Sequence, residues 1–290
     1  MENIGIIPNL IKDEGLVMTT KVVEWFETNG FKTLVTPTIA RRLNRNDMAT
    51  SEDDLYKTSD CIVVLGGDGT LLSVAQKAAT EKVPIIGVNL GRLGFLTDIE
   101  KSTALASFEK LVSGNYYIEE RMMLEVNILT SNNNTYQFLA LNDVSITRDN
   151  YSRMVDYSIH VNGQYADVYP ADGIIIATPT GSTAYNLSAG GPIVDPKANI
   201  MVLTPICPHT IYSRSIIVSE KDVIDIHISE LQGGSVGISI DGKKVHHMTP
   251  LDIIRVSKSD YTVRLLKLSE HNFYDILRSK IVERRPGNRD

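Results

Sequence analysis

The chain has 290 residues, of which 42% are hydrophobic and 22% are charged, and its net charge is -6 at pH 7. These values are typical of a soluble globular protein with one large or two ordinary domains, and the acidic balance argues against a nucleic-acid partner. There is no visible signal peptide, no disulfide framework and no apolar run near the roughly 20 residues that span a bilayer, so we predict a cytoplasmic protein without membrane contact.

Strand and helix patterns alternate along the first part of the chain. Apolar runs and helical periodicity predict strands over residues 4–8, 32–36, 61–65 and 84–88, and helices over residues 13–29, after residue 70 and over residues 101–113. The polar run over residues 44–57 is expected to form an exposed loop. Strands that alternate with helices build a parallel sheet covered on both faces. We therefore predict an N-terminal doubly wound α/β domain over residues 1–118.

The pattern changes from about Arg121, where short alternating segments replace the helices. Strands are predicted over residues 124–130, 135–141, 144–147, 156–161, 164–169, 173–177, 215–218, 223–229, 236–240 and 251–256. Asn162-Gly163 is a strong signal for a type I′ hairpin. We predict an antiparallel β-rich domain over residues 119–262, interrupted by a helical piece. Residues 263–290 are expected to form a strand and a helix that pack back on the first domain.

Residues 61–72 combine a buried strand, a glycine turn with one carboxylate and the start of a helix. Gly66, Gly67 and Gly69 let the backbone approach a ligand closely, and the N–H groups at a helix start favour a phosphate. Asp68 has two explanations, since aspartate is a favoured helix cap and also a candidate catalytic group. A P-loop lysine and the three-glycine dinucleotide fingerprint are both absent. The turn alone leaves both explanations open.

A second glycine-spaced loop, over residues 89–96, follows the strand predicted at residues 84–88. The carboxyl ends of parallel strands meet at one edge of a sheet, and open α/β sheets bind their ligands outside that edge. Both glycine loops therefore lie where we expect a ligand.

Residues 172–192 form the second chemically informative stretch. A strand leads into a small, hydroxyl-rich turn and a short helix that ends in paired glycines. The small side chains permit close backbone approach, the hydroxyls offer hydrogen bonds, and Tyr185 is suited to stack on a base or a nicotinamide ring. A Ser/Thr-capped helix with an ordinary loop is the structural alternative. The Gly-x-Ser-x-Gly elbow of a serine hydrolase is absent around Ser182.

Two acidic turns have both a structural and a functional explanation. Asn142-Asp143 lies between two predicted strands, where it is a turn signal that could also hold a polar ligand. Asp241-Gly242 follows another predicted strand and is first of all a hairpin turn.

Taken together, these stretches resemble the NAD kinase family. The family's Gly-Gly-Asp-Gly-Thr motif stands at residues 66–70, and its Asn-x-Gly-x-Leu-Gly-Phe-Leu stretch stands at residues 89–96. Its long run with Thr-Pro-Thr-Gly-Ser-Thr-Ala-Tyr lies within residues 172–192, and its Asn-Glu pair is represented by Asn142-Asp143. The first motif is shared with lipid kinases and phosphofructokinases, whereas the Thr-Pro-Thr-Gly-Ser-Thr-Ala-Tyr run is much more specific.

This resemblance implies ATP-dependent phosphorylation of the 2′-hydroxyl on the adenosine ribose of NAD, giving NADP, with a divalent cation that is usually Mg²⁺. It also implies an N-terminal α/β domain, a C-terminal β-sandwich-like domain and a chain end that returns to the first domain. Family members are homodimers or homotetramers, so the resemblance implies a homo-oligomer whose substrates are NAD and ATP.

The resemblance also assigns roles to particular residues. It makes Asp68 the catalytic base and leaves the metal ligands unassigned. The residues that it assigns to NAD are Asp68, Gly69, Asn142, Asp143, Arg153, Asp172, Thr183, Ala184, Tyr185, Asn186, Leu187, Ser188 and Lys243. Asp143 departs from the family pattern, because the family more often has glutamate there, one methylene longer.

The chemistry of phosphoryl transfer gives Asp68 a physical reason. The reaction needs positioning, neutralisation of phosphate charge and a base near the attacking hydroxyl. A carboxylate inside a phosphate-binding glycine loop lies close to both donor and acceptor. We therefore expect Gly66, Gly67, Gly69 and Thr70 to bind the phosphates of ATP while Asp68 accepts the hydroxyl proton.

Two alternatives use the same glycine turn. A lipid kinase of the diacylglycerol or sphingosine type would need an apolar groove or a basic membrane-facing patch, and the acidic balance of the chain argues against one. A non-catalytic dinucleotide sensor would keep the pocket, and the intact Asp68 argues against it.

Overall fold

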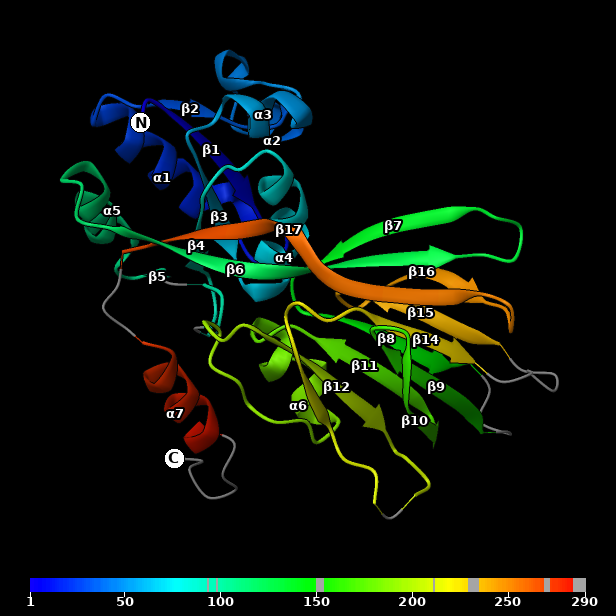
Figure 1. The fold of residues 1–290 in the computed structure, drawn as a ribbon. Coiled ribbons are helices and arrows are strands. Elements are labelled where there is room, and N and C mark those ends of the chain that lie inside the picture. The colour runs from blue at the N-terminus through cyan, green and yellow to red at the C-terminus, as the bar shows by residue number, and fades with distance from the viewer. Residues whose placement is uncertain are drawn as a thin grey trace. The chain divides into compact units, whose positions relative to one another are not determined.

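The computed structural model describes residues 1–92, 94–97, 99–149, 154–210, 212–228, 235–268 and 272–283. The chain forms two compact units (Figure 1). Unit 1 consists of Met1–Glu120 and Val263–Asp290, and unit 2 consists of Arg121–Thr262. The strands β6 (Tyr117–Leu129) and β17 (Ile253–Lys267) run through the two boundaries, so the chain passes between the units inside regular strands.

Unit 1 contains a parallel sheet with the strand order β2-β1-β3-β4. Its strands are β1 (Asn3–Pro8), β2 (Lys32–Leu34), β3 (Cys61–Gly66), β4 (Ile85–Asn89) and the short β5 (Ile99–Glu100), which pairs with β4. Leu265 of β17 pairs in parallel with Ile85. Every residue of β3 is buried, as its apolar run requires in a sheet covered on both faces. The strand order changes direction between β1 and β3, which makes their carboxyl ends the topological switch point of the sheet.

Helices cover both faces of this sheet, which confirms the predicted doubly wound architecture (Figure 1). The helices α1 (Val17–Thr28) and α5 (Ala104–Val112) share one core cluster with β1, β3 and β4, and in it the rings of Phe26 and Phe108 lie 4.8 Å apart. The helices α3 (Glu52–Thr58) and α4 (Asp68–Thr80) pack against β1 and β3 on the other face. The remaining elements are α2 (Pro37–Arg42) and the 3₁₀ turns η1 (Glu14–Leu16) and η2 (Asn46–Met48).

Residues 44–57 are not the exposed loop that their polarity predicted. They form η2 and most of α3, in which Leu55 and Tyr56 are buried. The Ser51 hydroxyl accepts a hydrogen bond from the Asp54 N–H at 3.1 Å and so caps the helix. A good N-cap and two buried apolar residues stabilise a short helix even when most of its side chains are charged.

Unit 2 is built from two antiparallel sheets, which confirms the predicted β-sandwich. One has the order β10-β9-β14-β17, and β6 pairs with both β17 and β7; its further strands are β7 (Thr135–Ala140), β9 (Val155–Val161), β10 (Gln164–Ala171) and β14 (Ile224–Ile228). The other has the order β13-β12-β11-β8-β15-β16, with β8 (Asp143–Arg148), β11 (Gly173–Ala177), β12 (Ile200–Ile206), β13 (Ile216–Ser219), β15 (Val236–Ile240) and β16 (Lys243–Met248). One apolar cluster takes residues from both sheets, including Tyr157 and Ile226 from the first and Ile146 and Ile174 from the second.

The strand predictions for unit 2 are partly wrong. The hairpin at Asn162-Gly163 is present, with φ values of 52° and 76° that suit a type I′ turn. The strands β12 and β16 were not predicted, and β17 is one continuous strand in place of two. Pro205 interrupts the apolar run of β12, because proline is uncommon inside a sheet, and this weakens the strand signal.

Three helical segments complete the fold. The 3₁₀ turn η3 (Thr180–Thr183) and the short α6 (Tyr185–Ser188) form the helical piece predicted in the β-rich domain. The helix α7 (Phe273–Glu283) follows β17 and belongs to unit 1. The ring of Phe273 lies 6.1 Å from that of Phe95, so the chain end returns to the first unit.

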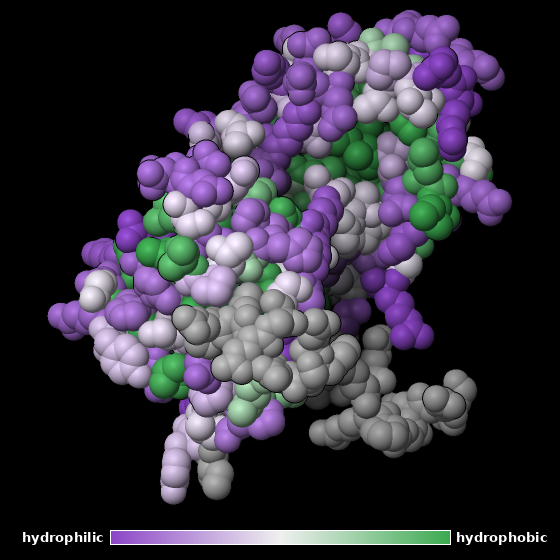
Figure 2. Space-filling view, turned by 90° about the vertical axis from the view of Figure 1, so that its right-hand side faces the viewer, coloured by the Kyte–Doolittle hydropathy of each residue, from purple (hydrophilic) through white to green (hydrophobic). Residues whose placement is uncertain are grey.

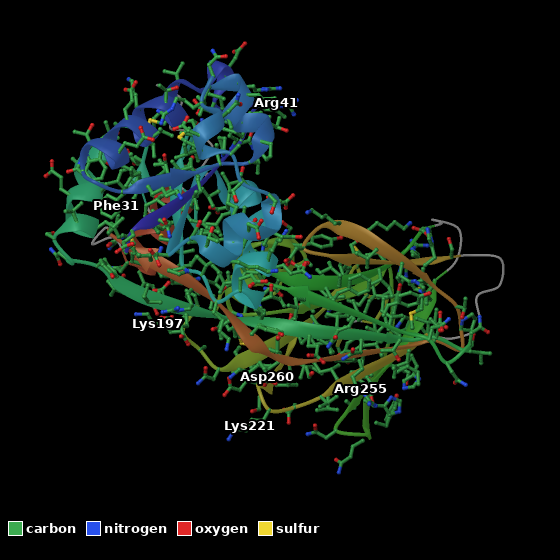
Figure 3. All side chains as sticks on the ribbon, turned by 90° about the horizontal axis from the view of Figure 1, so that it is seen from above. Phe31, Arg41, Lys197, Lys221, Arg255 and Asp260 are labelled. Carbon is green, nitrogen blue, oxygen red and sulfur yellow. The ribbon has the colours of Figure 1, made fainter. Side chains whose placement is uncertain are left out.

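Polar side chains dominate the surface. Purple, hydrophilic residues cover much of the face shown in Figure 2, and green, hydrophobic residues form smaller patches. Arg255, labelled in Figure 3, pairs with Asp225 through hydrogen bonds of 2.8 and 2.9 Å. No helix in the described part of the chain is both long and apolar enough to cross a membrane.

Candidate active site

The glycines of the turn between β3 and α4 differ in the space around them. A Cβ on Gly66 would lie 2.4 Å from the Thr70 hydroxyl oxygen, and a Cβ on Gly67 would lie 2.7 Å from the Lys12 Nζ. Gly69 differs, because a Cβ there would meet nothing within 4 Å. The contact with Thr70 therefore excludes a side chain at Gly66, whereas the flexible Lys12 side chain could move aside for one at Gly67, and Gly69 has open space among the described residues.

The carboxylate of Asp68 is held by a segment of the second glycine loop. Its Oδ2 accepts the N–H of Phe95 at 2.7 Å, and its Oδ1 accepts the N–H groups of Leu96 and Thr97 at 3.2 and 3.1 Å. The Thr97 hydroxyl donates to Oδ1 at 3.1 Å. The helix α4 begins at Asp68 with Gly67 as its N-cap and without a side-chain cap. Asp68 therefore does not cap α4, and its side chain is oriented by four donors from outside the helix.

Gly94 makes this contact possible. A Cβ on Gly94 would lie 1.9 Å from Oδ1 of Asp68, far inside contact distance. The Gly94 N–H donates to the Thr97 hydroxyl at 3.1 Å, and the amide of Asn89 donates to the same hydroxyl at 2.9 Å. The second glycine loop is thus shaped around the Asp68 carboxylate.

The start of α4 leaves backbone donors available. Among the described residues, the N–H groups of Gly67, Asp68 and Gly69 bond to no acceptor, whereas the N–H of Thr70 bonds to the Gly67 carbonyl at 2.9 Å. Unpaired N–H groups at the first turn of a 13-residue helix carry the positive end of its dipole. This turn can bind an anion.

In unit 2, hydrogen bonds to their backbone N–H groups hold Asn142 and Asp143 in place. Asp241 accepts the N–H groups of Leu141, Asn142 and Asp143 at 2.9, 2.7 and 3.2 Å. The Asn142 carbonyl accepts the N–H of Thr178 at 2.9 Å. The side chain of Asn142 remains half-buried and that of Asp143 buried. Asp241 occupies a hairpin turn with a φ of 49°, as predicted, but its carboxylate also organises this pair.

The buried Asp143 and the half-buried Asp241 form an acidic pair. Burial, with the nearby Asp241 as a second cause, raises the pKa of Asp143 from its ordinary value of 3.8 to about 7. Burial also raises the pKa of Asp241, and the three backbone donors and Lys243 act in the opposite direction. Because burial disfavours the charged form of each carboxyl, it is unfavourable for both to be ionised near neutral pH.

We expect this pair to make the stability of the protein pH-dependent. The unfolded Asp143 loses its proton near pH 4 and the folded one near pH 7, so between these values the folded state binds more protons and the free energy of unfolding falls as pH rises. Asp143→Asn should reduce this fall by on the order of 2–4 kcal/mol. Denaturant unfolding at pH 4.5 and 7.5 measures the fall in the free energy of unfolding. Equal falls in the wild type and the variant would contradict the prediction.

The hydroxyl-rich turn packs closely on Asn142. A Cβ on Gly181 would lie 2.0 Å from the Asn142 carbonyl oxygen, and the Thr178 hydroxyl donates to the Leu141 carbonyl at 2.6 Å. The turn presents side chains of different exposure. Tyr185 and Ser188 are exposed, while Thr183, Ala184 and Leu187 are half-buried.

Asn186 is the exception among the predicted NAD-binding residues of this turn. It is fully buried, and its amide donates to the carbonyls of Ser182 and Pro192, both at 3.0 Å. Its oxygen accepts the Thr204 hydroxyl at 2.7 Å. These bonds occupy the amide within unit 2, so the side chain of Asn186 holds the turn together.

The other predicted residues of unit 2 lie in different settings. Asp172 is half-buried and forms an ion pair with Arg148 at 2.7 Å. Lys243 is exposed directly after the Asp241-Gly242 turn. Arg153 lies outside the described residues.

Sequence reasoning missed the residues that position the carboxylates. Thr97 and Gly94 orient Asp68, and Asp241 orients Asn142 and Asp143. The only signal was the glycine spacing of residues 89–96 and the Asp-Gly dipeptide, both of which are ordinary turn signals. The bonds to Asp68 join residues that are 27–29 positions apart, and those to Asp241 join residues that are 98–100 positions apart. Periodicity cannot detect contacts over such separations.

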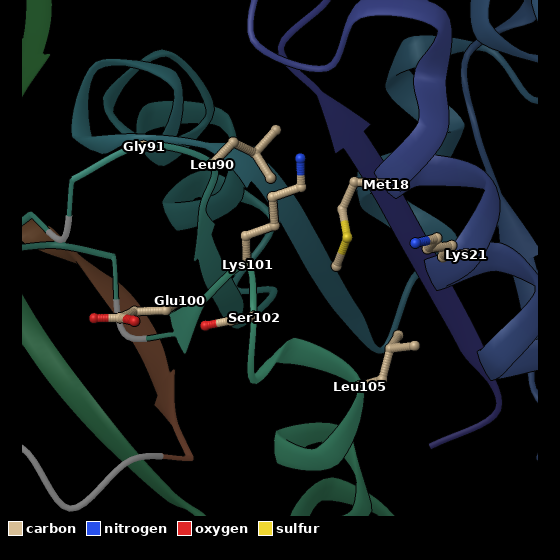
Figure 4. A pocket seen from close by; sticks show the side chains of 8 residues that line it. All are labelled: Met18, Lys21, Leu90, Gly91, Glu100, Lys101, Ser102 and Leu105. Atoms are coloured by element: carbon tan, nitrogen blue, oxygen red, sulfur yellow. The ribbon is translucent and has the colours of Figure 1, made fainter.

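A cavity of about 590 Å³ lies in unit 1 between α1 and the start of α5 (Figure 4). Met18, Leu90 and Leu105 give it apolar walls, and Lys21 and Lys101 add two ammonium groups. None of the predicted site residues lines it. In unit 1 the predicted site residues belong to the glycine turn and not to this cavity.

Taken together, a glycine turn with unpaired N–H groups and an oriented carboxylate, and a β-rich unit with a hydroxyl-rich turn, are typical of a nucleotide-dependent phosphotransferase. Comparison with known proteins identifies the family more specifically. The model of the ATP-NAD kinase N-terminal domain matches residues 4–116, and that of the ATP-NAD kinase C-terminal domain matches residues 141–268.

Full-length relatives and solved structures point to the same family. An NAD kinase from Caldanaerobacter subterraneus subsp. tengcongensis is 45% identical over 284 residues, which cover 98% of this chain and 100% of the relative. One from Symbiobacterium thermophilum is 41% identical over 272 residues, with coverages of 93% and 96%. The structure of yeast NADH kinase complexed with NADH has a TM-score of 0.86 and 27% identity, covering 100% of this chain and 89% of that one. An Archaeoglobus fulgidus NAD kinase in complex with ATP shares the fold, with a TM-score of 0.73, 24% identity and coverages of 97% and 98%. The chain belongs to the NAD kinase family.

Proposed function

We propose that this chain transfers the terminal phosphoryl group of ATP to the 2′-hydroxyl on the adenosine ribose of NAD, with Asp68 as the general base. The observation that carries the role of Asp68 is its oriented carboxylate. Four donors fix its direction, and Oδ2 accepts only one of them, so this oxygen keeps capacity for a hydroxyl proton. A positioned base of this kind contributes roughly 10²–10⁴ in rate.

Gly66, Gly67, Gly69 and Thr70 bind the phosphates of ATP in this proposal. The unpaired N–H groups at the start of α4 supply donors for phosphate oxygens. The open space beside Gly69 supports it as well, because no contact with a described residue explains the missing side chain there. Close approach of a phosphate to the backbone does explain it.

A divalent cation, Mg²⁺ in our proposal, fits this donor set only as a companion of the nucleotide. No group of three or more His, Cys, Asp or Glu side chains in the described residues could hold a metal ion by itself. Mg²⁺ commonly binds through one or two carboxylates together with substrate phosphates and water. We propose that the phosphates of ATP, together with water, hold the ion, which would neutralise phosphate charge.

On the acceptor side, the proposal assigns NAD to residues of unit 2. Asn142 and Asp143, held in place by Asp241, would bind a ribose. The ring of Tyr185 is 43% exposed and can stack on a base or a nicotinamide. The further residues assigned to NAD are Asp68, Gly69, Arg153, Asp172, Thr183, Ala184, Asn186, Leu187, Ser188 and Lys243.

We also propose a cytoplasmic homo-oligomer, either a dimer or a tetramer. Cys61 and Cys207 are both free thiols, which suits a reducing compartment. The oligomer follows from the resemblance to a family of dimers and tetramers. Sedimentation equilibrium measures its size, and a monomer at micromolar concentration would contradict this part of the proposal.

Incubating the purified protein with ATP, Mg²⁺ and NAD tests the activity, with NADP measured as the product. We expect NADP to form with NAD and no phosphorylated product to form with diacylglycerol or sphingosine in place of NAD. Phosphorylation of a lipid, or tight NAD binding without turnover, would contradict the proposal and favour a lipid kinase or a dinucleotide sensor.

A further inference from the structure

The segment after β1 lies beside the glycine turn at the switch point of the unit 1 sheet. Asn9 follows β1, and its backbone N–H donates to the Leu65 carbonyl of β3 at 2.7 Å. Its side-chain amide donates to the Thr70 hydroxyl at 2.9 Å. Asn9 therefore joins the carboxyl ends of β1 and β3 at the place where open α/β sheets bind ligands.

The same side chain fixes the backbone of Lys12. The Asn9 Oδ1 accepts the N–H groups of Ile11 and Lys12 at 3.0 and 3.1 Å, and the Asn9 carbonyl accepts the N–H of Lys12 at 3.2 Å. One residue thus holds both the glycine turn and the base of the Lys12 side chain. The position of Lys12 relative to residues 66–70 is set by local hydrogen bonds.

The ammonium group of Lys12 lies against the glycine turn. A Cβ on Gly67 would be only 2.7 Å from the Lys12 Nζ, although the residue as a whole is exposed. The nearby carboxylates, in the segment after β1 and in the glycine turn, accept hydrogen bonds from other residues. Asp13 accepts the N–H groups of Met18 and Thr19 and the Thr19 hydroxyl, and Asp68 accepts its four donors from residues 95–97. No ion pair of Lys12 occurs within the described residues.

We propose that Lys12 is a ligand of the phosphates of ATP, an inference that rests on the proposed binding of these phosphates at residues 66–70. A lysine ammonium is a compact charge with three donors, and phosphoryl transfer depends on such charges to stabilise phosphate oxygens. The ammonium lies against Gly67, whose N–H is one of the donors that we assign to phosphate. The mobile stem lets it follow the phosphates during transfer.

Binding measurements with matched lysine variants test this role. Calorimetry would measure the affinities for Mg²⁺ with a non-hydrolysable ATP analogue, and separately for NAD, in the wild type, Lys12→Met, Lys12→Arg and Lys32→Met. Lys32 is the control, because it is equally exposed but starts β2 at the amino end of the same sheet, paired with Asn3. NADP formation would be measured on the same preparations.

We expect Lys12→Met to weaken binding of the ATP analogue about 10- to 100-fold, which corresponds to a charged hydrogen bond. Binding of NAD should change by less than about twofold, Lys12→Arg should recover much of the loss, and Lys32→Met should match the wild type. Equal affinities for the analogue in Lys12→Met and Lys32→Met, or an equal loss for NAD, would overturn the inference even if NADP forms normally. Lys12-dependent binding of the analogue without NADP formation would instead overturn the proposed function.

Discussion

Replacing Asp68 by asparagine is expected to lower kcat by about 10²–10⁴, the contribution of a general base. The amide is nearly isosteric with the carboxylate but cannot accept the hydroxyl proton. Asp68 is also one of the residues that we assign to NAD, so kcat is compared at saturating ATP and NAD, where a weaker affinity does not contribute. Steady-state kinetics with NADP as the measured product, on protein shown to be folded, tests the prediction.

This replacement also has a structural cost, which must be separated from catalysis. An amide at position 68 brings an NH₂ group toward the N–H groups of residues 95–97, and we expect a loss of about 1–3 kcal/mol in the free energy of unfolding. Thr97→Val is the matched comparison, because it removes one donor to Asp68 and keeps the carboxylate. If Thr97→Val lost as much activity as Asp68→Asn at similar stability, the carboxylate would be structural and not catalytic.

Gly94→Ala is expected to lower kcat/KM by about 10- to 10³-fold by moving the Asp68 carboxylate. The new Cβ would lie 1.9 Å from Oδ1, so either the carboxylate or the loop must shift, and a displaced base loses its geometry. Relieving such an overlap in a packed site also costs about 1–3 kcal/mol of stability. Kinetics and denaturant unfolding of the same variant measure both effects.

Two comparisons make this prediction specific. Gly91→Ala adds a Cβ at an ordinary 3.7 Å from the Asn89 Oδ1, and its stability should be close to that of the wild type. In an Asp68→Ala background, Gly94→Ala should cost little stability, because the atoms that collide are gone. A stability cost that persists in the double variant would show that the collision with Asp68 is not its cause.

The strand, turn and helix at residues 61–80 were readable from sequence because each has a strong local cause. Five apolar residues in a row require burial on both faces, and the glycines and the following helical periodicity place the turn and α4. The short helix α3 escaped the same reasoning, since its stability comes from the Ser51 cap and from two buried residues among charges. Local polarity was the stronger signal there, and tertiary packing overrode it.

The sequence indicated the candidate functional residues of the site but not the residues that position them. The motif resemblance pointed to Asp68 and to Asn142 with Asp143, because they stand in recognisable turns. It did not show that Asp68 is held by residues 95–97, or that Asp241 holds the Asn142 pair, because these contacts form only when distant turns fold together. Nor did it show that the side chain of Asn186 is buried and held by three hydrogen bonds.

The most direct test of the role of Asp68 is a crystal structure of this protein with NAD, Mg²⁺ and a non-hydrolysable ATP analogue. We expect Oδ2 of Asp68 to lie within about 2.6–3.2 Å of the 2′-oxygen on the adenosine ribose, the distance from which a base can accept its proton. A 2′-oxygen in contact with a different carboxylate, with Asp68 bonded only to residues 95–97, would contradict the account.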